Sequence, residues 1–297
     1  MATARIEADV TVAERLRLQL RELTPAERKV ARALMADYPV GGIEPIARLA
    51  AAAGVSAPTV VRLVSKLGFA SYADFQQSLK SEVSARLCSP LEMHTRRLAA
   101  QHGDDALRRA ELLLCGGIQS SFDRLPPAEF DQAVRLLAEP RHSVSLIGGR
   151  FSSMLAEYLA AHLRILRPRV HMISAAGADR MMSILDVGRR DVLVAFDYRR
   201  YQHDTVRLAL TAKEQGATVI AFTDPYLSPL SSHADVILTS SVQSPSPFDA
   251  LTPAVALVEA VIAALVDRLG DVPRARMARF DALQRGTVGA GSTMEEM

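Results

Sequence analysis

Between residues 45 and 69, apolar side chains follow two short helical periods that are separated by a glycine. Ile46, Leu49 and Ala50 have the spacing i, i+3, i+4 and share one face of the first helix. Gly54 is expected to end that helix, because glycine readily adopts the left-handed backbone of a helix stop. The second period places its apolar stripe at Val60, Leu63, Val64 and Leu67. The pattern predicts two helices joined by a tight turn.

Polar residues mark the start and the other face of the second helix. Ser56 is expected to cap it, with its hydroxyl accepting a free backbone N–H. Thr59, Arg62 and Lys66 follow at i, i+3 and i+7, opposite the apolar stripe. Such a helix suits the major groove of DNA, and we predict a helix-turn-helix that contacts DNA through these four residues. A hairpin whose cations serve solubility alone is the alternative.

The flanking residues extend this prediction to a small helical domain over residues 1–88. Thr24, Pro25 and Glu27 match a helix start with a cap, a first-turn proline and a capping box. A further helical run covers residues 72–83. The domain holds twelve Lys and Arg against nine Asp and Glu. This modest basic excess suits phosphate contacts by a dimer.

From residue 143 onward the period changes to short apolar runs that alternate with helices. This alternation predicts a parallel sheet covered on both faces, a three-layer α/β/α domain with five strands. Residues 126–284 are assigned to it, residues 89–125 to a helical connector and residues 285–297 to a flexible tail. A strongly apolar helix over residues 253–269 is expected to be buried or to form a subunit interface. The expected strands cover residues 144–147, 170–173, 191–196, 218–222 and 235–238.

Composition changes this picture little. The 297 residues carry a net charge of +2, so any basic character is local. The chain starts without an apolar signal segment and has no apolar run of about 18 residues, so we expect a cytoplasmic protein. Cys88 and Cys115 lie far apart, and the seven histidines form no metal-binding spacing. Neither a metal nor another cofactor is expected.

A candidate ligand site follows the first expected strand. Gly148 and Gly149 permit close backbone approach, and Ser152 and Ser153 begin a helix whose free N–H groups attract anions. In parallel sheets, ligands bind at the carboxyl ends of the strands. The segment therefore points to an anion site, although a plain strand–helix turn would have the same sequence features.

The second half of the chain resembles the sugar isomerase (SIS) domain, which binds phosphosugars. The resemblance rests on Gly148, Ser152 and residues 213–223, 228–230 and 234–235. The N-terminal part resembles the helix-turn-helix of RpiR-type transcription regulators, through residues 23–25, 56, 59–62 and 67–69. That family joins the two domains in this order. The resemblance implies a regulator of carbohydrate catabolism that responds to phosphorylated sugars, as a homodimer or homotetramer.

The sequence departs from the SIS pattern after the third strand. SIS domains usually carry S-x-S-G-x-T there, whereas this chain has Asp197, Arg199 and Arg200 at the two serine positions and the glycine. Arg150 likewise replaces a glycine after the first strand. Since arginine binds phosphate and carboxylate in two-point geometry, we predict an anionic sugar effector, a phosphosugar or a sugar acid. Alternatively, Asp197 pairs with one of these arginines or orients a sugar hydroxyl, or an internal Arg–Asp pair closes the pocket so that it binds nothing. The expected effector residues are Gly148, Gly149, Arg150, Ser152, Ser153, Asp197, Arg199, Arg200 and Thr223.

The competing function is a sugar-phosphate isomerase or deaminase. Isomerisation needs a base beside the substrate, and the candidates are His203, Asp204 and Glu259. None has an identifiable partner in the sequence. A free-standing isomerase also has no use for a DNA-reading helix, so we expect a regulator without catalytic residues, whose partners are operator DNA and a small effector. An interaction module built on an inactive fold is a third possibility.

Overall fold

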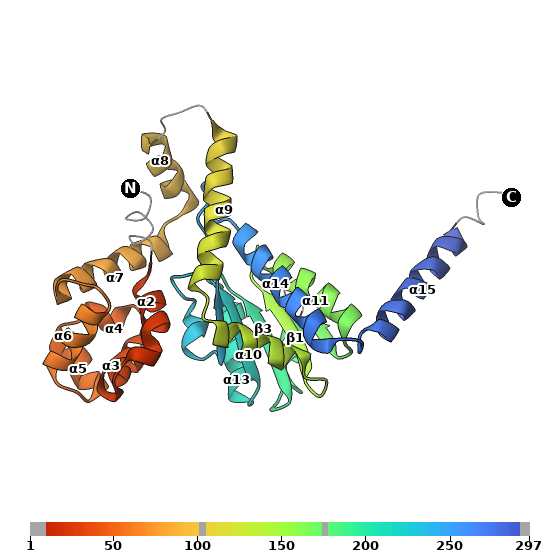
Figure 1. Cartoon of the computed structure of the whole chain (residues 1–297), viewed down its shortest axis with the longest axis horizontal. Coiled ribbons are helices and arrows are strands. Elements are labelled where there is room, and N and C mark those ends of the chain that lie inside the picture. Colours follow the sequence, from red (N-terminus) through yellow and green to blue (C-terminus); the bar gives the residue numbers. More distant parts are fainter. Residues whose placement is uncertain (1–9, 101–104, 174–177, 292–297) are drawn as a thin grey trace.

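The computed structural model describes residues 10–100, 105–173 and 178–291, and it contains a helical part and an α/β part (Figure 1). Caps define two of the first helices. Thr24 and Glu27 form the predicted capping box of α3. A second capping box, formed by Thr11 and Glu14, starts a helix that was not predicted. The helical part consists of α2 (Val12–Gln19), the 3₁₀ turn η1 (Leu20–Glu22), α3 (Pro25–Ala36), α4 (Val40–Ile43), α5 (Ile46–Ala53), α6 (Ala57–Lys66) and α7 (Tyr72–Leu87).

One apolar core holds these helices together. The predicted stripe of α6 lies in it, because Val60, Leu63, Val64 and Leu67 are all buried. Phe75 and Leu79 bring α7 into the same core. The helical part therefore has its own hydrophobic cluster, separate from those of the sheet.

Five parallel strands form the sheet of the second part, as predicted. Their order is β2-β1-β3-β4-β5, so the direction in which successive strands are added to the sheet reverses between β1 and β3. Val144 pairs with Val170 on one side and with Val192 on the other. Ligands collect at such a reversal point, outside the carboxyl ends of the strands. The strands are β1 (Ser143–Gly148), β2 (Val170–Met172), β3 (Asp191–Phe196), β4 (Thr218–Thr223) and β5 (Val236–Thr239).

Helices cover both faces of this sheet, which confirms the three-layer α/β/α fold. Val192 and Val194 pack with helices on one face, while Leu193 and Ala195 pack with helices on the other. This alternation follows from the two-residue period of a strand. One face is covered by α10 (Pro127–Ala138), α11 (Ser153–Leu166) and α14 (Thr252–Leu269), the other by α13 (His203–Glu214) and the 3₁₀ turn η2 (Pro229–Ser232). The short helix α12 (Ala178–Met182) contacts α13, because Arg180 Nη2 donates to Thr205 Oγ1 at 3.0 Å. None of the described helices is by itself long and apolar enough to cross a membrane.

The connector and the tail contain more helix than expected. After α8 (Pro90–Ala100), α9 (Ala106–Arg124) runs through Gly116 and Gly117 without a break. Gly117 instead permits close packing on α14, because a Cβ there would lie 3.2 Å from Pro253 Cγ. Past α14, the helix α15 (Arg274–Gly291) projects from the α/β body (Figure 1). It extends into residues 285–291, which were predicted to belong to a flexible tail, and residues 292–297 lie outside the described part.

Candidate DNA-binding and effector sites

The two helices α5 and α6 have the geometry of a helix-turn-helix. They meet at 101°, within the range of about 90–120° for this motif. Gly54 has φ +62°, and its N–H donates to the carbonyls of Ala50 and Ala51. Ser56 precedes α6 with an extended backbone, but its hydroxyl makes no capping bond. The predicted cap is wrong in this respect, since Ser56 Oγ lies 3.1 Å from Thr59 Oγ1 instead.

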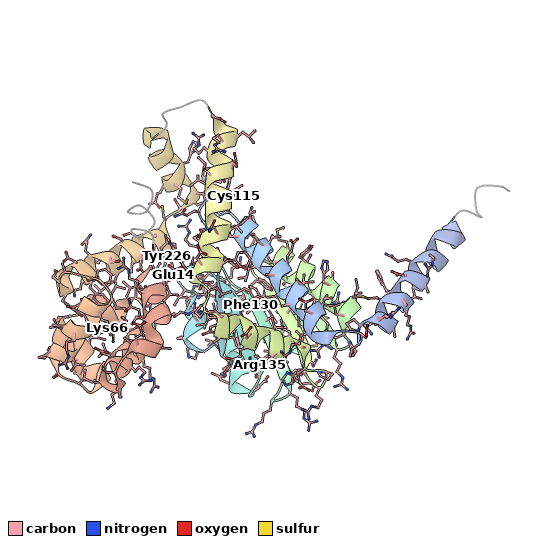
Figure 2. All side chains as sticks on the ribbon, in the orientation of Figure 1. Glu14, Lys66, Cys115, Phe130, Arg135 and Tyr226 are labelled. Atoms are coloured by element: carbon pink, nitrogen blue, oxygen red, sulfur yellow. The ribbon has the colours of Figure 1, made fainter. Side chains whose placement is uncertain are left out.

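The polar residues of α6 divide into exposed and packed groups. Arg62 is exposed, and its Nη2 donates to Thr59 Oγ1 at 3.0 Å. Thr59 is buried, so the expectation that it faces solvent is wrong. Lys66 is half-buried and ties α6 to the preceding segments, because its Nζ donates to the Glu22 carbonyl at 2.5 Å and pairs with Glu27 at 3.5 Å (Figure 2). Of the two predicted cationic DNA contacts, Arg62 is thus the more exposed.

At the carboxyl end of β1, Ser152 ties together the loops that follow β1 and β3. Its hydroxyl accepts from Gly149 N at 2.9 Å and donates to the Phe196 carbonyl at 2.7 Å. Gln202 packs on Gly149, since a Cβ on Gly149 would lie 3.3 Å from Gln202 Cδ. Ser153 begins α11, and its N–H donates to the Gly149 carbonyl. The predicted site residues of the first loop therefore lie beside those of the third, with Ser152 satisfied internally.

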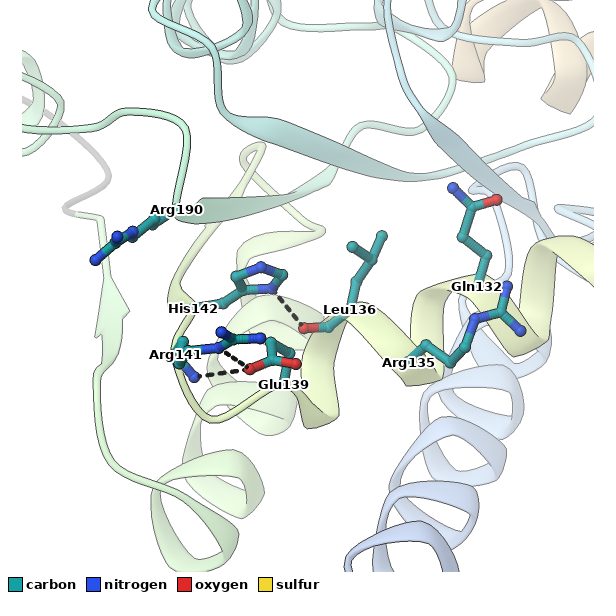
Figure 3. Close-up of a pocket in the computed structure, with 7 residues that line it drawn as sticks. All are labelled: Gln132, Arg135, Leu136, Glu139, Arg141, His142 and Arg190. Atoms are coloured by element: carbon teal, nitrogen blue, oxygen red, sulfur yellow. Dashed lines mark hydrogen bonds and ion pairs between the residues drawn. The ribbon is translucent and has the colours of Figure 1, made fainter.

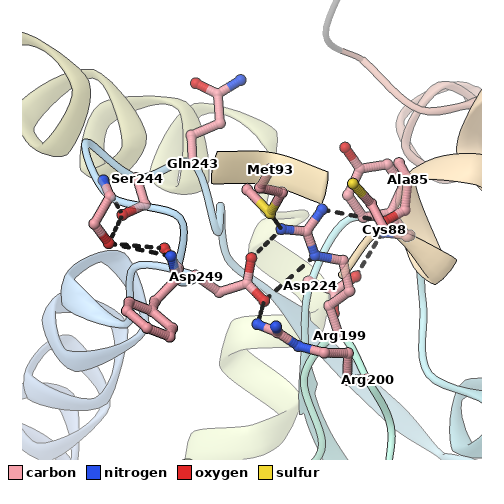
Figure 4. Close-up of polar contacts among 12 residues, drawn as sticks. Ala85, Cys88, Met93, Arg199, Arg200, Asp224, Gln243, Ser244 and Asp249 are labelled. Atoms are coloured by element: carbon pink, nitrogen blue, oxygen red, sulfur yellow. Dashed lines mark hydrogen bonds and ion pairs between the residues drawn. The ribbon is translucent and has the colours of Figure 1, made fainter. Parts of the chain in front are cut away.

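Arg199 and Arg200 converge on one carboxylate, that of Asp249 in the loop between β5 and α14 (Figure 4). Arg199 Nε donates to Asp249 Oδ2 at 3.3 Å, and its Nη2 pairs with Oδ1. Arg200 Nη2 donates to Oδ2 at 2.8 Å. Burial lowers the pKa of Arg199, but the hydrogen bond and the charge of Asp249 together raise it above its ordinary value. Arg150 is exposed at the neighbouring loop.

Arg200 keeps the backbone shape of the residue that it replaces. Its φ is +69°, in the left-handed region that favours glycine. The SIS pattern has glycine at this position, the residue that adopts this conformation without strain. The retained left-handed turn supports the predicted alignment of this loop, and its strain is of order 1 kcal/mol or more.

Asp197 takes part in a different set of contacts from the arginines. It accepts from Gln202 N at 3.1 Å and from the hydroxyl of Ser228. Burial raises its pKa to about 6. Thr223 is also buried, and its Oγ1 accepts from Ser228 N at 3.1 Å. Asp197 therefore fastens the loop after β4 to the end of β3, and Thr223 fastens the same loop to the end of β4.

The helical part docks on these same loops. Arg86 of α7 donates to the carbonyls of Tyr226 and Leu227 in the loop after β4, the latter at 2.8 Å. Arg199 returns the contact, since its Nη1 donates to the Ala85 carbonyl at 3.2 Å. On α2, Arg17 donates to the Ile237 carbonyl at 2.5 Å. Figure 2 places Glu14 and Tyr226 at this junction. Sequence patterns gave no sign of it, because these four acceptors are main-chain oxygens. The side-chain ion pairs across the junction, Arg17 with Glu129 at 3.8 Å and Arg124 with Glu14 at 3.7 Å, join residues more than 100 positions apart.

A buried carboxyl beside this junction makes stability pH-dependent. Glu82 accepts from Val12 N at 2.8 Å and from the Tyr38 hydroxyl, and burial raises its pKa to about 7. A group with a raised folded pKa binds its proton more tightly when folded, so its stabilisation is lost as pH rises from about 4.5 to 7.

We therefore expect Glu82→Gln to change the pH profile. Relative to the variant, the wild type should lose about 2 kcal/mol of unfolding free energy between pH 5 and pH 8. Urea unfolding at both pH values measures this difference. Parallel profiles for the two proteins would show that Glu82 is not the responsible group.

A cavity of about 530 Å³ lies at the opposite edge of the sheet (Figure 3). It is bordered by the end of α10 and by residues that precede β1 and β3, among them Arg135, His142 and Arg190. Arg141 there pairs with Glu139 at 2.9 Å. None of the predicted effector residues lines it. Within the described ranges, no group of three or more His, Cys, Asp or Glu side chains is arranged to hold a metal ion.

A helix-turn-helix joined to a five-stranded SIS-type domain defines a transcriptional regulator. Residues 10–86 match the helix-turn-helix domain of the rpiR family, and residues 136–264 match the SIS domain. The HTH-type transcriptional regulator HexR of Pseudomonas aeruginosa is 30% identical over 216 residues, which cover 71% of this chain and 72% of that protein. The chain belongs to the RpiR family.

Two further matches differ in extent. The bifunctional protein glk of Burkholderia mallei is 30% identical over 236 residues, which cover 78% of this chain and 35% of that protein. The chain thus spans about a third of that protein's length. The Vibrio vulnificus NanR protein, solved in complex with ManNAc-6P, shares the fold with a TM-score of 0.50 and 19% identity, over 91% of this chain and 97% of that one.

Proposed function

We propose that this chain binds operator DNA through the exposed face of α6 and that an anionic sugar derivative regulates this binding from the carboxyl edge of the sheet. The observation that carries the proposal is the docking of α7 on the loops that follow β3 and β4, which we call the effector loops. Arg86 and Arg199 cross this junction in opposite directions. A ligand that moves the loops after β3 and β4 therefore alters the contacts that hold the DNA-binding part. The size of the response is set by the difference in the ligand's affinity for the docked and the altered arrangement of the two parts.

Regulation of this kind needs no turnover, and the candidate bases support that reading. Asp204 is exposed and pairs with Arg207 at 3.6 Å on α13. Glu259 accepts from Tyr158 at 3.1 Å at an exposed position between α14 and α11. His203 is exposed at the start of α13. Asp204 and Glu259 are thus occupied by other side chains, and we propose a regulator of carbohydrate genes with no isomerase or deaminase activity. NanR, which has the same fold, was solved with a phosphorylated sugar.

The test is capture of operator DNA from sheared genomic DNA by the full-length protein, with and without a panel of sugar phosphates and sugar acids. We expect the footprint to contain two half-sites about one helical turn apart, because a two-fold dimer presents two reading helices. Sedimentation of the full-length protein should accordingly give the mass of a dimer or tetramer.

Arg199→Ala should keep operator binding and lose the response to the effector, whereas Arg169→Ala, an exposed arginine at the opposite edge of the sheet, should keep both. A normal response by Arg199→Ala would place the effector elsewhere. Conversion of a sugar phosphate by the purified protein would favour the enzyme alternative.

A further inference from the structure

We infer that Asp249 is an internal competitor for the effector's anionic group, and that it restricts the effector to a phosphomonoester. The inference rests on the proposed function and concerns the same site. Two guanidinium groups from consecutive residues, Arg199 and Arg200, converge on this one carboxylate (Figure 4). Two converging guanidinium groups are the arrangement that binds an anionic ligand, and here the bound anion is a carboxylate of the protein itself.

The location of the pair supports this role. Arg199 and Arg200 follow β3 directly, at the edge of the sheet where this fold collects ligands. Asp249 reaches the same edge from the loop before α14. The side chains of Arg199 and Asp249 are only 8% and 9% exposed, while that of Arg200 is 33% exposed. Arg200 is therefore the accessible end of the pair, where an incoming anion makes its first contact.

Competition with Asp249 selects between classes of anion. A ligand with a single carboxylate offers the arginines the same chemistry as Asp249, which is already tethered in place. A phosphomonoester carries a charge of about −1.5 to −2 at neutral pH and three strong acceptor oxygens. It can engage both guanidinium forks at once and gains charge–charge attraction that a carboxylate cannot match. A phosphorylated sugar thus displaces Asp249, and a sugar acid of equal size does so poorly.

Displacement is coupled to the DNA-binding part through one guanidinium. Besides Asp249, Arg199 contacts the Ala85 carbonyl of α7 at 3.2 Å and Met93 Sδ of α8 at 3.4 Å. A phosphate that takes Arg199 from Asp249 pulls on the group that holds α7. The contact therefore differs between the free and the bound state, which is the condition for a ligand to shift an equilibrium.

The experiment compares the full-length wild type with Asp249→Asn, using calorimetric titration of three probes. These are glucose 6-phosphate, glucuronate and inorganic phosphate, so that a hexose phosphate and a hexose carboxylate are matched. The wild type should bind glucose 6-phosphate about tenfold or more tightly than glucuronate, the equivalent of 1.4 kcal/mol. Asp249→Asn should bind all three probes more tightly, with the largest gain for glucuronate. Asp271→Asn, which removes an exposed carboxylate beyond α14, should match the wild type.

The outcomes separate this inference from the proposed function. If the wild type binds glucose 6-phosphate and Asp249→Asn changes nothing, the effector site stands and the role of Asp249 is overturned. If neither sugar binds but Asp249→Asn gains affinity for inorganic phosphate, Asp249 competes with anions as inferred, and the proposal of a sugar effector is overturned. Should Asp249→Asn fail to fold, Arg200→Gln at the accessible end replaces it. That variant should lose about tenfold in phosphate affinity, and unchanged affinity would overturn the inference.

Discussion

Alanine at position 62 is expected to weaken specific operator binding by roughly tenfold to a hundredfold. Arg62 is the exposed cation of α6, and Thr59 orients its guanidinium through the 3.0 Å hydrogen bond. A base-contacting arginine contributes about 1–3 kcal/mol of discrimination, which corresponds to this range. Fluorescence anisotropy with operator and scrambled duplexes at a single salt concentration measures the change, which should be larger for the operator.

A neighbouring arginine supplies the control for Arg62. Arg48 is exposed on α5 and pairs with Glu44 at 3.3 Å, so Arg48→Ala removes the same charge from the adjacent helix. Any effect of that variant should be similar on both duplexes and should diminish as salt is added, as for a phosphate contact. If Arg62→Ala binds the operator like the wild type, α6 is not the reading helix.

Gly148→Ala is expected to destabilise the α/β part by about 1–3 kcal/mol or more. A Cβ at this position would lie 2.5 Å from Ser153 N and Cα and 2.6 Å from the Ser152 carbonyl oxygen. These are backbone atoms at the start of α11, so relief requires the helix to move away from the sheet. The same movement would break the hydrogen bonds by which Ser152 joins the loop after β1 to the end of β3. Urea unfolding followed by circular dichroism measures the loss.

Gly116→Ala is the matched control for this substitution. A Cβ on Gly116 meets nothing within 4 Å, and the residue lies inside α9. Its replacement should leave stability unchanged or raise it by up to about 1 kcal/mol, because alanine has the higher helix propensity. Equal stability of Gly148→Ala and the wild type would mean that the loop after β1 is less tightly packed against α11 than the distances indicate.

Local patterns predicted the helices and strands in which the spacing of apolar residues along the sequence matches the buried face of the element. The buried runs that became β1, β3 and β4 are of this kind, as is the stripe of α6. The close packing of Gly117 has no local signal, because its partner, Pro253, is far away in the sequence. The helix α15 was missed because it has no strong apolar period and projects from the body (Figure 1). Thr59 was misplaced because its position borders the buried stripe of the same helix.

The sequence predicted the residues of the candidate site that lie within one loop, but not their partners from distant segments. Arg199 and Arg200 were identified from their departure from the SIS pattern, and an internal Arg–Asp pair was foreseen as an alternative. The pairing acid proved to be Asp249, whereas Asp197 binds Ser228 and Gln202. No sequence spacing indicates Asp249, since it lies about fifty residues away and the sheet topology alone brings it to the arginines. Arg86 was missed because its acceptors are carbonyls, which every residue has.

That reliance on main-chain acceptors has a consequence for divergence within such regulators. The oxygens that receive Arg86, Arg17 and Arg199 belong to residues whose side chains take no part in these bonds. A substitution at an accepting position leaves the main-chain oxygen in place. The loops after β3 and β4 can therefore acquire new side chains and new ligand preferences while these hydrogen bonds to the DNA-binding part are kept. The constraint falls on the donors. Side chains of the accepting residues can therefore change without cost to these bonds, whereas Arg199 is constrained twice, because it contacts both Asp249 and the Ala85 carbonyl of α7.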